Sequence, residues 1–292
     1  MLSHNITIGA ECARQRFRFA TCHACVEACP AQALTLTEEG IAVDAEQCID
    51  CAVCQFICPQ EAIRGVNSPL RYFCNHTLVA PFTTIAPTLE ELLLWHKEQG
   101  ITAIAIDLSQ AKAWERALLL LNECLRQYGE EGWSVVSPHT SEVNVSRRRL
   151  FHVQRADVQM TQIQPGLRRL HYLWPQISDA RPMMDPQKCQ LCGACWRACE
   201  QQVFSLNEGH LQINDALCNG CQNCIAVCFH QAMTVELTIL PAKIVNLHAN
   251  RKVCKTCQKS FLTFQQNAQN CLYCQRHICH AIVCFVPDCC LN

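Results

Sequence analysis

Seven cysteines in the first part of the chain recur 170 residues later, all in the same register. The first set is Cys22, Cys25, Cys29, Cys48, Cys51, Cys54 and Cys58, and the second is Cys192, Cys195, Cys199, Cys218, Cys221, Cys224 and Cys228. The segments between them also agree in length and in the alternation of apolar residues. Chance does not easily place seven cysteines in register, so we interpret the repeat as a duplicated module.

Cysteine is unusually abundant, with 26 residues in a chain of 292. So many thiols serve as disulfides, metal ligands or cluster ligands, and the cellular compartment separates these options. The first residues lack the apolar run of about 7–15 residues that marks a secretory signal, and no stretch approaches the roughly 18 apolar residues of a membrane helix. We therefore expect a cytoplasmic protein with no membrane span, in which reduced thiols bind metal.

The spacing C-x-x-C-x-x-C-x-x-x-C occurs three times in full, beginning at Cys48, Cys189 and Cys218. In such a run three thiolates converge on one iron–sulfur cube, while the fourth ligates the neighbouring cube. The runs therefore predict interleaved ligand sets for [4Fe–4S] clusters. The sets are Cys189, Cys192 and Cys195 with Cys228; Cys218, Cys221 and Cys224 with Cys199; and Cys48, Cys51 and Cys54 with Cys29. Zinc sites use pairs of C-x-x-C separated by longer loops, so clusters are favoured over zinc here.

The remaining run is irregular, because Phe19 stands where the repeat has Cys189 and the only cysteine upstream is Cys12. We assign Cys12, Cys22, Cys25 and Cys58 to a fourth [4Fe–4S] cluster. A [3Fe–4S] cluster on three thiolates, with Cys12 not a ligand, is the alternative. An otherwise intact motif with one displaced cysteine favours an insertion, and hence the Cys12 assignment.

The formal net charge is −1 when every cysteine is counted as neutral. Bound clusters make the charge more negative, since four thiolates around a 2+ core leave about −2 per site. Nucleic-acid binding depends on a net positive surface, so we expect no nucleic-acid partner.

These runs resemble the bacterial two-cluster ferredoxin family over residues of about 10–65 and 180–235. Pro30 and Pro59 follow the fourth cysteine as in that family, whereas Glu200 and Phe229 replace the proline in the second copy. The resemblance implies a βαβ-type module and one-electron transfer. It also predicts two short hairpins, pairing Ala33–Leu36 with Ile41–Val43 and Val203–Leu206 with Leu211–Ile213.

Between Cys58 and Cys189 the pattern changes, and only two cysteines, Cys74 and Cys124, occur there. Thr88 to Glu91 form a capping box that predicts a helix ending at Gly100. Residues 101–108 predict a buried strand, residues 114–128 a second helix and residues 133–137 a further strand. Helices that alternate with strands in this way indicate an α/β domain with parallel strands. No glycine lies between the first strand and the second helix, so we expect a docking or spacer role and no nucleotide site.

Near the C-terminus Cys254, Cys257, Cys271 and Cys274 follow C-x-x-C-x13-C-x-x-C, which resembles a zinc ribbon. Gln258 and Gln275 stand where ribbon knuckles commonly have glycine. A rubredoxin-like iron fits the same ligands, but the knuckles lack the Pro and Gly of that family, so zinc is favoured. The sequence leaves the roles of four further cysteines open: Cys279, Cys284, Cys289 and Cys290.

The expected fold class is α+β, with two ferredoxin-like modules, a central α/β domain and a small zinc-ribbon-like segment. The expected domains are residues 1–66 (first dicluster module), 67–180 (central α/β domain), 181–240 (second dicluster module) and 250–292 (Cys-rich segment).

We expect an electron carrier rather than an enzyme: a polyferredoxin or electron-transfer subunit that passes single electrons to or from a partner oxidoreductase. The four runs also resemble the four-cluster subunits of molybdopterin oxidoreductases, which makes such an enzyme a candidate partner. The basic run Arg147, Arg148, Arg149 is interpreted as a solvated face or as a contact for an acidic redox partner. The alternative function is an assembly or regulatory protein that senses oxygen or iron, which is the hypothesis that the zinc ribbon favours.

Overall fold

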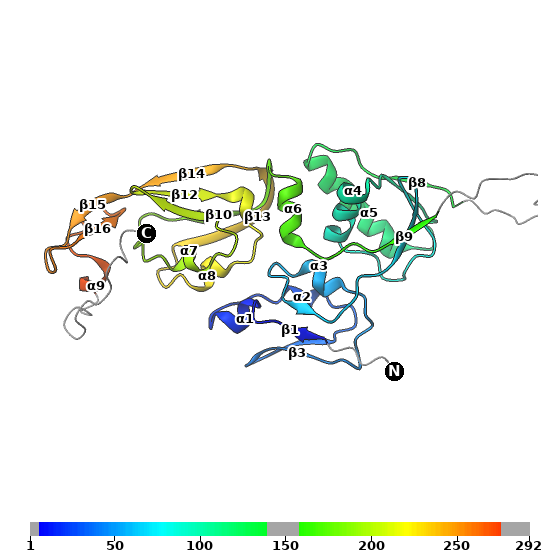
Figure 1. Ribbon diagram of the computed structural model, residues 1–292, viewed down its shortest axis with the longest axis horizontal. Coiled ribbons are helices and arrows are strands. Elements are labelled where there is room, and N and C mark those ends of the chain that lie inside the picture. Colours follow the sequence, from blue (N-terminus) through cyan, green and yellow to red (C-terminus); the bar gives the residue numbers. More distant parts are fainter. Residues whose placement is uncertain (1–5, 139–157, 276–292) are drawn as a thin grey trace, which may run out of the picture. The chain divides into compact units, whose positions relative to one another are not determined.

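The computed structural model describes residues 6–138 and 158–275, which form two compact units (Figure 1). Unit 1 comprises residues 1–12 and 23–174, and unit 2 comprises residues 13–22 and 175–292. The basic run Arg147, Arg148, Arg149 and the four cysteines after Cys274 lie outside the described residues.

Unit 1 contains the first cysteine module and the central domain. The module consists of β1 (Thr7–Ile8), α2 (Ala24–Ala28), β2 (Leu34–Thr37), β3 (Gly40–Val43), α3 (Val53–Ile57) and β4 (Ile63–Arg64). The central domain consists of β5 (Arg71–Cys74), β6 (Thr77–Val79), α4 (Leu89–Gln99), β7 (Ala103–Ala105), α5 (Lys112–Gln127), β8 (Ser134–Val136), β9 (Gln159–Thr161) and α6 (Leu167–Leu173).

The first module is built from two short antiparallel ladders and two one-turn helices. Strands β2 and β3 form the predicted hairpin, with Leu34 opposite Val43, and β1 pairs with β4. Helices α2 and α3 pack against each other, and each begins inside a cysteine run. Leu34 and Phe56 are buried between these elements, so the hairpin and the helices close around the cysteine loops.

The central domain has a mixed five-stranded sheet in the order β8-β7-β6-β5-β9. Strands β6, β7 and β8 run parallel, which confirms the parallel strands predicted for this region. Strand β5 pairs antiparallel with both β6 and β9, a part of the sheet that the sequence analysis did not predict. Strand β7 is shorter than predicted, although Ile101 and Ile106 on either side of it are buried.

The predicted caps of α4 are both present. The Thr88 side chain accepts a hydrogen bond from the Glu91 N–H at 3.2 Å, and Gly100 adopts a left-handed conformation at φ 65°. Helix α5 lies beside α4 (Figure 1), and it buries Trp114 and Leu118 on one face. Hydrophobic burial therefore fixes the positions of both helices.

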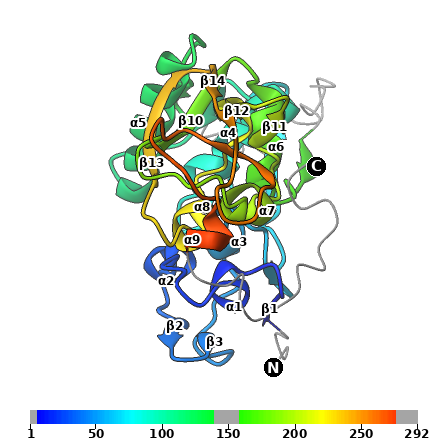
Figure 2. The ribbon, with the colours of Figure 1, turned by 90° about the vertical axis from the view of Figure 1, so that its left-hand side faces the viewer.

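Unit 2 contains the second cysteine module and the C-terminal segment, and Figure 2 shows it from the end that carries β15, β16 and α9. Its elements are α1 (Ala13–Arg16), β10 (Ile177–Met184), α7 (Ala194–Ala198), β11 (Phe204–Asn207), β12 (His210–Asn214), a 3₁₀ turn (Asp215–Leu217), α8 (Asn223–Ala226), β13 (Met233–Pro241), β14 (Ile244–His248), β15 (Asn250–Val253), β16 (Ser260–Thr263) and α9 (Leu272–Gln275).

The second module repeats the first on longer strands. The predicted hairpin is present as β11 and β12, and the long pair β10–β13 corresponds to β1–β4. Strand β14 adds a third strand to the hairpin by pairing with β12. The core between these strands contains Phe204, Leu211 and Met233 together with Cys195 and Cys224, so the cysteine loops form part of the hydrophobic core.

Among residues 6–138 and 158–275, no helix is both long enough and apolar enough to cross a lipid bilayer.

Candidate metal centres

Three of the cysteine loops share an unusual backbone conformation. In each loop the residues directly before and directly after the second cysteine have positive φ angles. They are Asp50 (53°) and Ala52 (59°), Leu191 (51°) and Gly193 (80°), and Gly220 (68°) and Gln222 (60°). This left-handed conformation costs roughly 1–2 kcal/mol for a residue with a Cβ, and such strain persists mainly at ligand sites. The three loops therefore adopt the same backbone geometry although their residues differ.

A second shared feature is the turn that follows the fourth cysteine of each run. The N–H four residues further on donates to the Sγ of that cysteine. The printed sulfur contacts are Ala33 N to Cys29 Sγ (3.3 Å), Ala62 N to Cys58 Sγ (3.4 Å) and Ala232 N to Cys228 Sγ (3.2 Å). Donors of this kind favour the thiolate, which is the form that binds iron. The turn forms after Cys228 with Phe229 in place of proline, so proline is not required for it.

The cysteines of the set Cys48, Cys51, Cys54 and Cys29 line one small cavity together with apolar side chains. The pKa of the Cys54 thiol is raised to about 12, first by burial and then by the negative charge of the other three. Cys29 belongs to a different run from its three neighbours. The structure thus brings together residues from two runs.

A second small cavity is lined by Cys189, Cys192, Cys195 and Cys228. Burial raises the pKa of Cys195 to about 12, and charges on the other three cysteines add to the effect. Burial likewise raises the pKa of Cys189 to about 11. Again the fourth residue comes from the neighbouring run.

In the third set, Cys218, Cys221 and Cys224 belong to one run and Cys199 comes from the neighbouring run. Burial raises the pKa of Cys218 to about 12; the Gly220 N–H lowers it, while Cys221 and Cys199 raise it further. Burial also raises the pKa of Cys224, with further contributions from Cys218, Cys221, Cys195 and Cys199.

These surroundings suit iron–sulfur clusters. Burial and, after it, repulsion between thiolates raise these pKa values. Metal binding replaces the thiol proton, so this repulsion is relieved when cations share the thiolates. Apolar walls and backbone N–H donors to sulfur are the features through which a protein holds and tunes such a cluster. The residues therefore fit the group, although the ligand sets themselves remain predictions.

The first run of the chain departs from this pattern. His23, the counterpart of Gly193, has φ −143° where the other three loops are left-handed. Cys12 and Cys58 are buried, whereas Cys22 lies in the segment 13–22 that clusters with unit 2. Both alternatives for the set Cys12, Cys22, Cys25 and Cys58 stay open.

The C-terminal cysteines form a compact site. Cys254 and Cys257 lie in the turn between β15 and β16, and Cys271 and Cys274 lie at α9. The four Sγ atoms all lie within 4.8 Å of one another, and those of Cys257 and Cys271 are 3.8 Å apart. Four sulfurs at about 2.3 Å from one tetrahedral ion are roughly 3.8 Å apart. The site therefore fits one tetrahedral ion, and both zinc and a rubredoxin-like iron meet this geometry.

The surroundings of the Cys254 thiol lower its pKa, which favours binding of a cation. Burial raises its pKa, but the backbone N–H groups of Cys257, Cys271 and Thr256 outweigh that effect and lower the pKa to about 6. The lowered pKa favours the thiolate of Cys254, which is the form that binds metal.

Gln258 adopts a left-handed conformation at φ 59°, at the knuckle position where zinc ribbons commonly have glycine. Substitution Gln258→Gly is expected to stabilise the metal-loaded segment by about 1 kcal/mol, because it removes the Cβ penalty of that conformation. The measurement is the chelator concentration that removes half of the C-terminal metal. Gln275, which ends α9, is the matched position, and Gln275→Gly should give no gain. Earlier metal loss in Gln258→Gly than in the unsubstituted protein would contradict this account.

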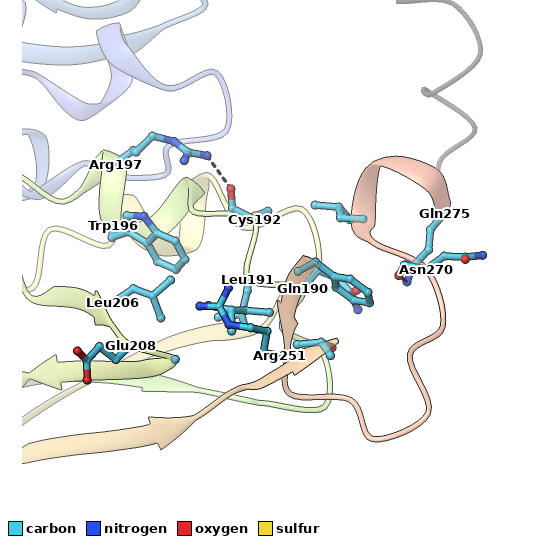
Figure 3. A pocket seen from close by; sticks show the side chains of 15 residues that line it. Gln190, Leu191, Cys192, Trp196, Arg197, Leu206, Glu208, Arg251, Asn270 and Gln275 are labelled. Atoms are coloured by element: carbon cyan, nitrogen blue, oxygen red, sulfur yellow. Dashed lines mark hydrogen bonds between the residues drawn. The ribbon is translucent and has the colours of Figure 1, made fainter. Parts of the chain in front are cut away.

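A polar pocket lies beside Cys192, between the second module and the C-terminal hairpin (Figure 3). Cys192 alone is exposed among the described cysteines. The Arg197 guanidinium donates to the Cys192 carbonyl oxygen at 2.6 Å. Trp196 and Arg251 also line the pocket, and the exposed Arg251 side chain forms no ion pair with any described residue.

Sequence reasoning missed this pocket and the sulfur-directed N–H donors. Every residue except proline carries an N–H, so the donors leave no trace in the sequence. The pocket depends on how β15 and β16 continue from β14, which is a matter of strand pairing and not of residue type.

Two segments of the chain, residues 20–62 and 188–232, match the family model of the 4Fe-4S dicluster domain. Hydrogenase-4 component A of Escherichia coli (strain K12) is 32% identical over 96 residues, which cover 29% of this chain and 46% of that protein. The chain thus spans less than half the length of that relative. Taken with the repeated cysteine loops, the matches identify residues 20–62 and 188–232 as two 4Fe-4S dicluster domains of the bacterial-ferredoxin type.

Proposed function

We propose that this protein is an iron–sulfur electron-transfer protein, a polyferredoxin or electron-transfer subunit, that carries four [4Fe–4S] clusters. It passes single electrons to or from a partner oxidoreductase. The observation that carries this proposal is the interleaving of the runs, in which Cys29 and Cys228 line cavities with the first three cysteines of another run. With interleaved ligands, each run of a module contributes cysteines to both clusters of that module.

The two ligand sets of the second module adjoin each other. Burial raises the pKa of Cys224, and so do its own set and Cys195 of the neighbouring set. Helices α7 and α8, which start inside the two runs, also pack together. When clusters occupy such neighbouring sites, single electrons can pass directly from one cluster to the other.

An oxidoreductase complex is the partner class that the comparison supports. The matched relative is a hydrogenase component by name, so a hydrogenase-type complex joins the molybdopterin enzymes as a candidate. The dicluster matches favour the carrier over a regulatory protein. We include in the proposal one zinc at Cys254, Cys257, Cys271 and Cys274, and the domain division 1–66, 67–180, 181–240 and 250–292.

We further propose that electrons are exchanged with the partner at the polar pocket, because Cys192 brings one cluster site to the surface there. Reversing the charge of Arg251, as in Arg251→Glu, should slow oxidation of the reduced protein by anionic ferricyanide several-fold at low ionic strength. The same change should accelerate oxidation by cationic hexaamminecobalt(III). Stopped-flow absorbance measures both rates, and added salt should abolish the difference.

The control is Arg116→Glu on α5, which makes the same charge change at an exposed position of unit 1. It should affect both oxidants much less than Arg251→Glu does. Equal effects of the two variants would place the exchange site elsewhere.

The proposed function is tested by repeated cycles of reduction and oxidation under anaerobic conditions. A carrier takes up and returns about one electron per cluster in every cycle without loss of iron. Iron loss on the first oxidation, or clusters that accept no electron, would contradict the electron-transfer role.

A further inference from the structure

Asn223 presents a buried polar group without a protein partner. Its side chain is 1% exposed, and neither Oδ1 nor Nδ2 makes a hydrogen bond to any described residue. Buried amides nearly always have a partner, since an unpaired one loses its hydrogen bonds to water without replacement. The missing partner is therefore expected in a group that binds beside Asn223.

Asn223 lies inside a cluster loop, between the left-handed Gln222 and the predicted ligand Cys224. The corresponding positions of the other three runs hold apolar residues: Ala24, Val53 and Ala194. Ala194 lines the cavity formed by the cysteines of its own set. Since the loops share one backbone geometry, the position of Asn223 borders the site of Cys218, Cys221 and Cys224.

We propose that Asn223 donates a hydrogen bond from Nδ2 to a sulfur of the cluster held by Cys218, Cys221, Cys224 and Cys199. It thereby sets this cluster's potential above the value that an alanine or valine at position 223 would give. The inference rests on the proposed function and assigns Asn223 as a direct hydrogen-bond donor to one cluster of the four.

The physical reason is the change of charge on reduction. One electron enters the cluster and no bond breaks, so the reduced cluster carries one more negative charge on its sulfurs. An N–H donor stabilises that state more than the oxidised state, and hydrogen bonds to sulfur raise the reduction potential. Asn223 therefore favours the reduced form of this cluster over what an apolar residue at position 223 would allow.

The test is an anaerobic potentiometric titration, with dithionite as the reductant, followed by EPR of the whole chain. Substitution Asn223→Leu keeps the branched shape and the number of side-chain heavy atoms and removes the donor, and Asn223→Ala matches the runs that have Ala24 and Ala194. In both variants, at a fixed potential, one cluster should show about a tenfold lower ratio of reduced to oxidised form, equivalent to about 59 mV for one electron. The other clusters should titrate as before.

A reciprocal variant keeps the inference testable if Asn223→Leu and Asn223→Ala lose the cluster. Ala194→Asn places the donor at the matching position of the neighbouring loop, and it should raise the potential of that cluster instead. Full iron content with unchanged potentials in Asn223→Leu and Asn223→Ala would overturn the inference. If those two variants lose iron, an unchanged potential in Ala194→Asn would overturn it. An unsubstituted protein that contains no inorganic sulfide would instead contradict the proposed function.

Discussion

Replacing Cys228 by alanine is expected to remove a cluster from a run to which Cys228 does not belong. About four irons and four sulfides per chain should be lost, together with the signal of the cluster bound by Cys189, Cys192 and Cys195. The cluster bound by Cys218, Cys221 and Cys224 should remain. The measurement is iron and sulfide analysis with EPR of the anaerobically purified variant.

The expectation follows from the cavity that Cys228 lines together with Cys189, Cys192 and Cys195. Burial raises the pKa of Cys195, and Cys189, Cys192 and Cys228 contribute to that shift. The mirror variant Cys199→Ala should remove the other cluster of the module and spare this one, since Cys199 contributes to the raised pKa of Cys218.

Cys124→Ala is the matched control, because Cys124 is buried in α5 and belongs to no ligand set. It should retain all of the iron. Loss of the Cys218, Cys221 and Cys224 cluster from Cys228→Ala would show that each run binds its own cube, and the interleaved assignment would be wrong.

Glu91→Ala should destabilise the central domain by about 3–5 kcal/mol, as expected when one partner of a buried ion pair is removed. Arg71 and Glu91 side chains are only 6% and 4% exposed and are paired twice, with Arg71 Nη2 donating to Glu91 Oε2 at 3.0 Å. The Trp95 indole N–H also donates to Glu91, at 3.3 Å. The variant leaves the Arg71 charge buried without its counter-charge. Urea unfolding followed by tryptophan fluorescence measures the loss.

Glu115→Ala provides the comparison, since Glu115 pairs with Lys112 on the exposed face of α5. Surface pairs of this kind contribute about 0–1 kcal/mol, so this variant should unfold close to the unsubstituted protein. A Glu91→Ala variant of equal stability would mean that Arg71 finds another partner or reaches water.

Patterns that are local in sequence predicted the elements that local contacts form. The Thr88 capping box and Gly100 marked both ends of α4, and the hairpins β2–β3 and β11–β12 formed where apolar residues alternate around short turns. The residues that determine each of these elements lie close together in the sequence, so one short segment is enough to predict the element.

Elements that depend on distant pairing were missed. Strands β5 and β9 meet although Phe73 and Gln159 are far apart in the chain, and β14 joins β12 through contacts such as Leu247 with Leu211. Short strands of this kind carry little pattern of their own, because their position is decided by the neighbouring strand.

For the candidate sites, the ligand sets stay predictions from cysteine spacing, and the C-x-x-C-x-x-C loops have one backbone geometry in three places. The assignment of Cys12, Cys22, Cys25 and Cys58 in the irregular first run also stays a prediction, and His23 there has a different backbone conformation from its counterparts. The exposure of Cys192 also had no sequence signal, since it depends on the pocket between two segments.

The interleaved cluster sites are tested most directly by anaerobic analysis of iron, inorganic sulfide and zinc in the purified chain, with EPR recorded during a redox titration. We predict about sixteen irons and sixteen sulfides per chain in cubes that each accept one electron, with one zinc at the C-terminal site. Colourless protein that contains zinc and no inorganic sulfide would contradict the account.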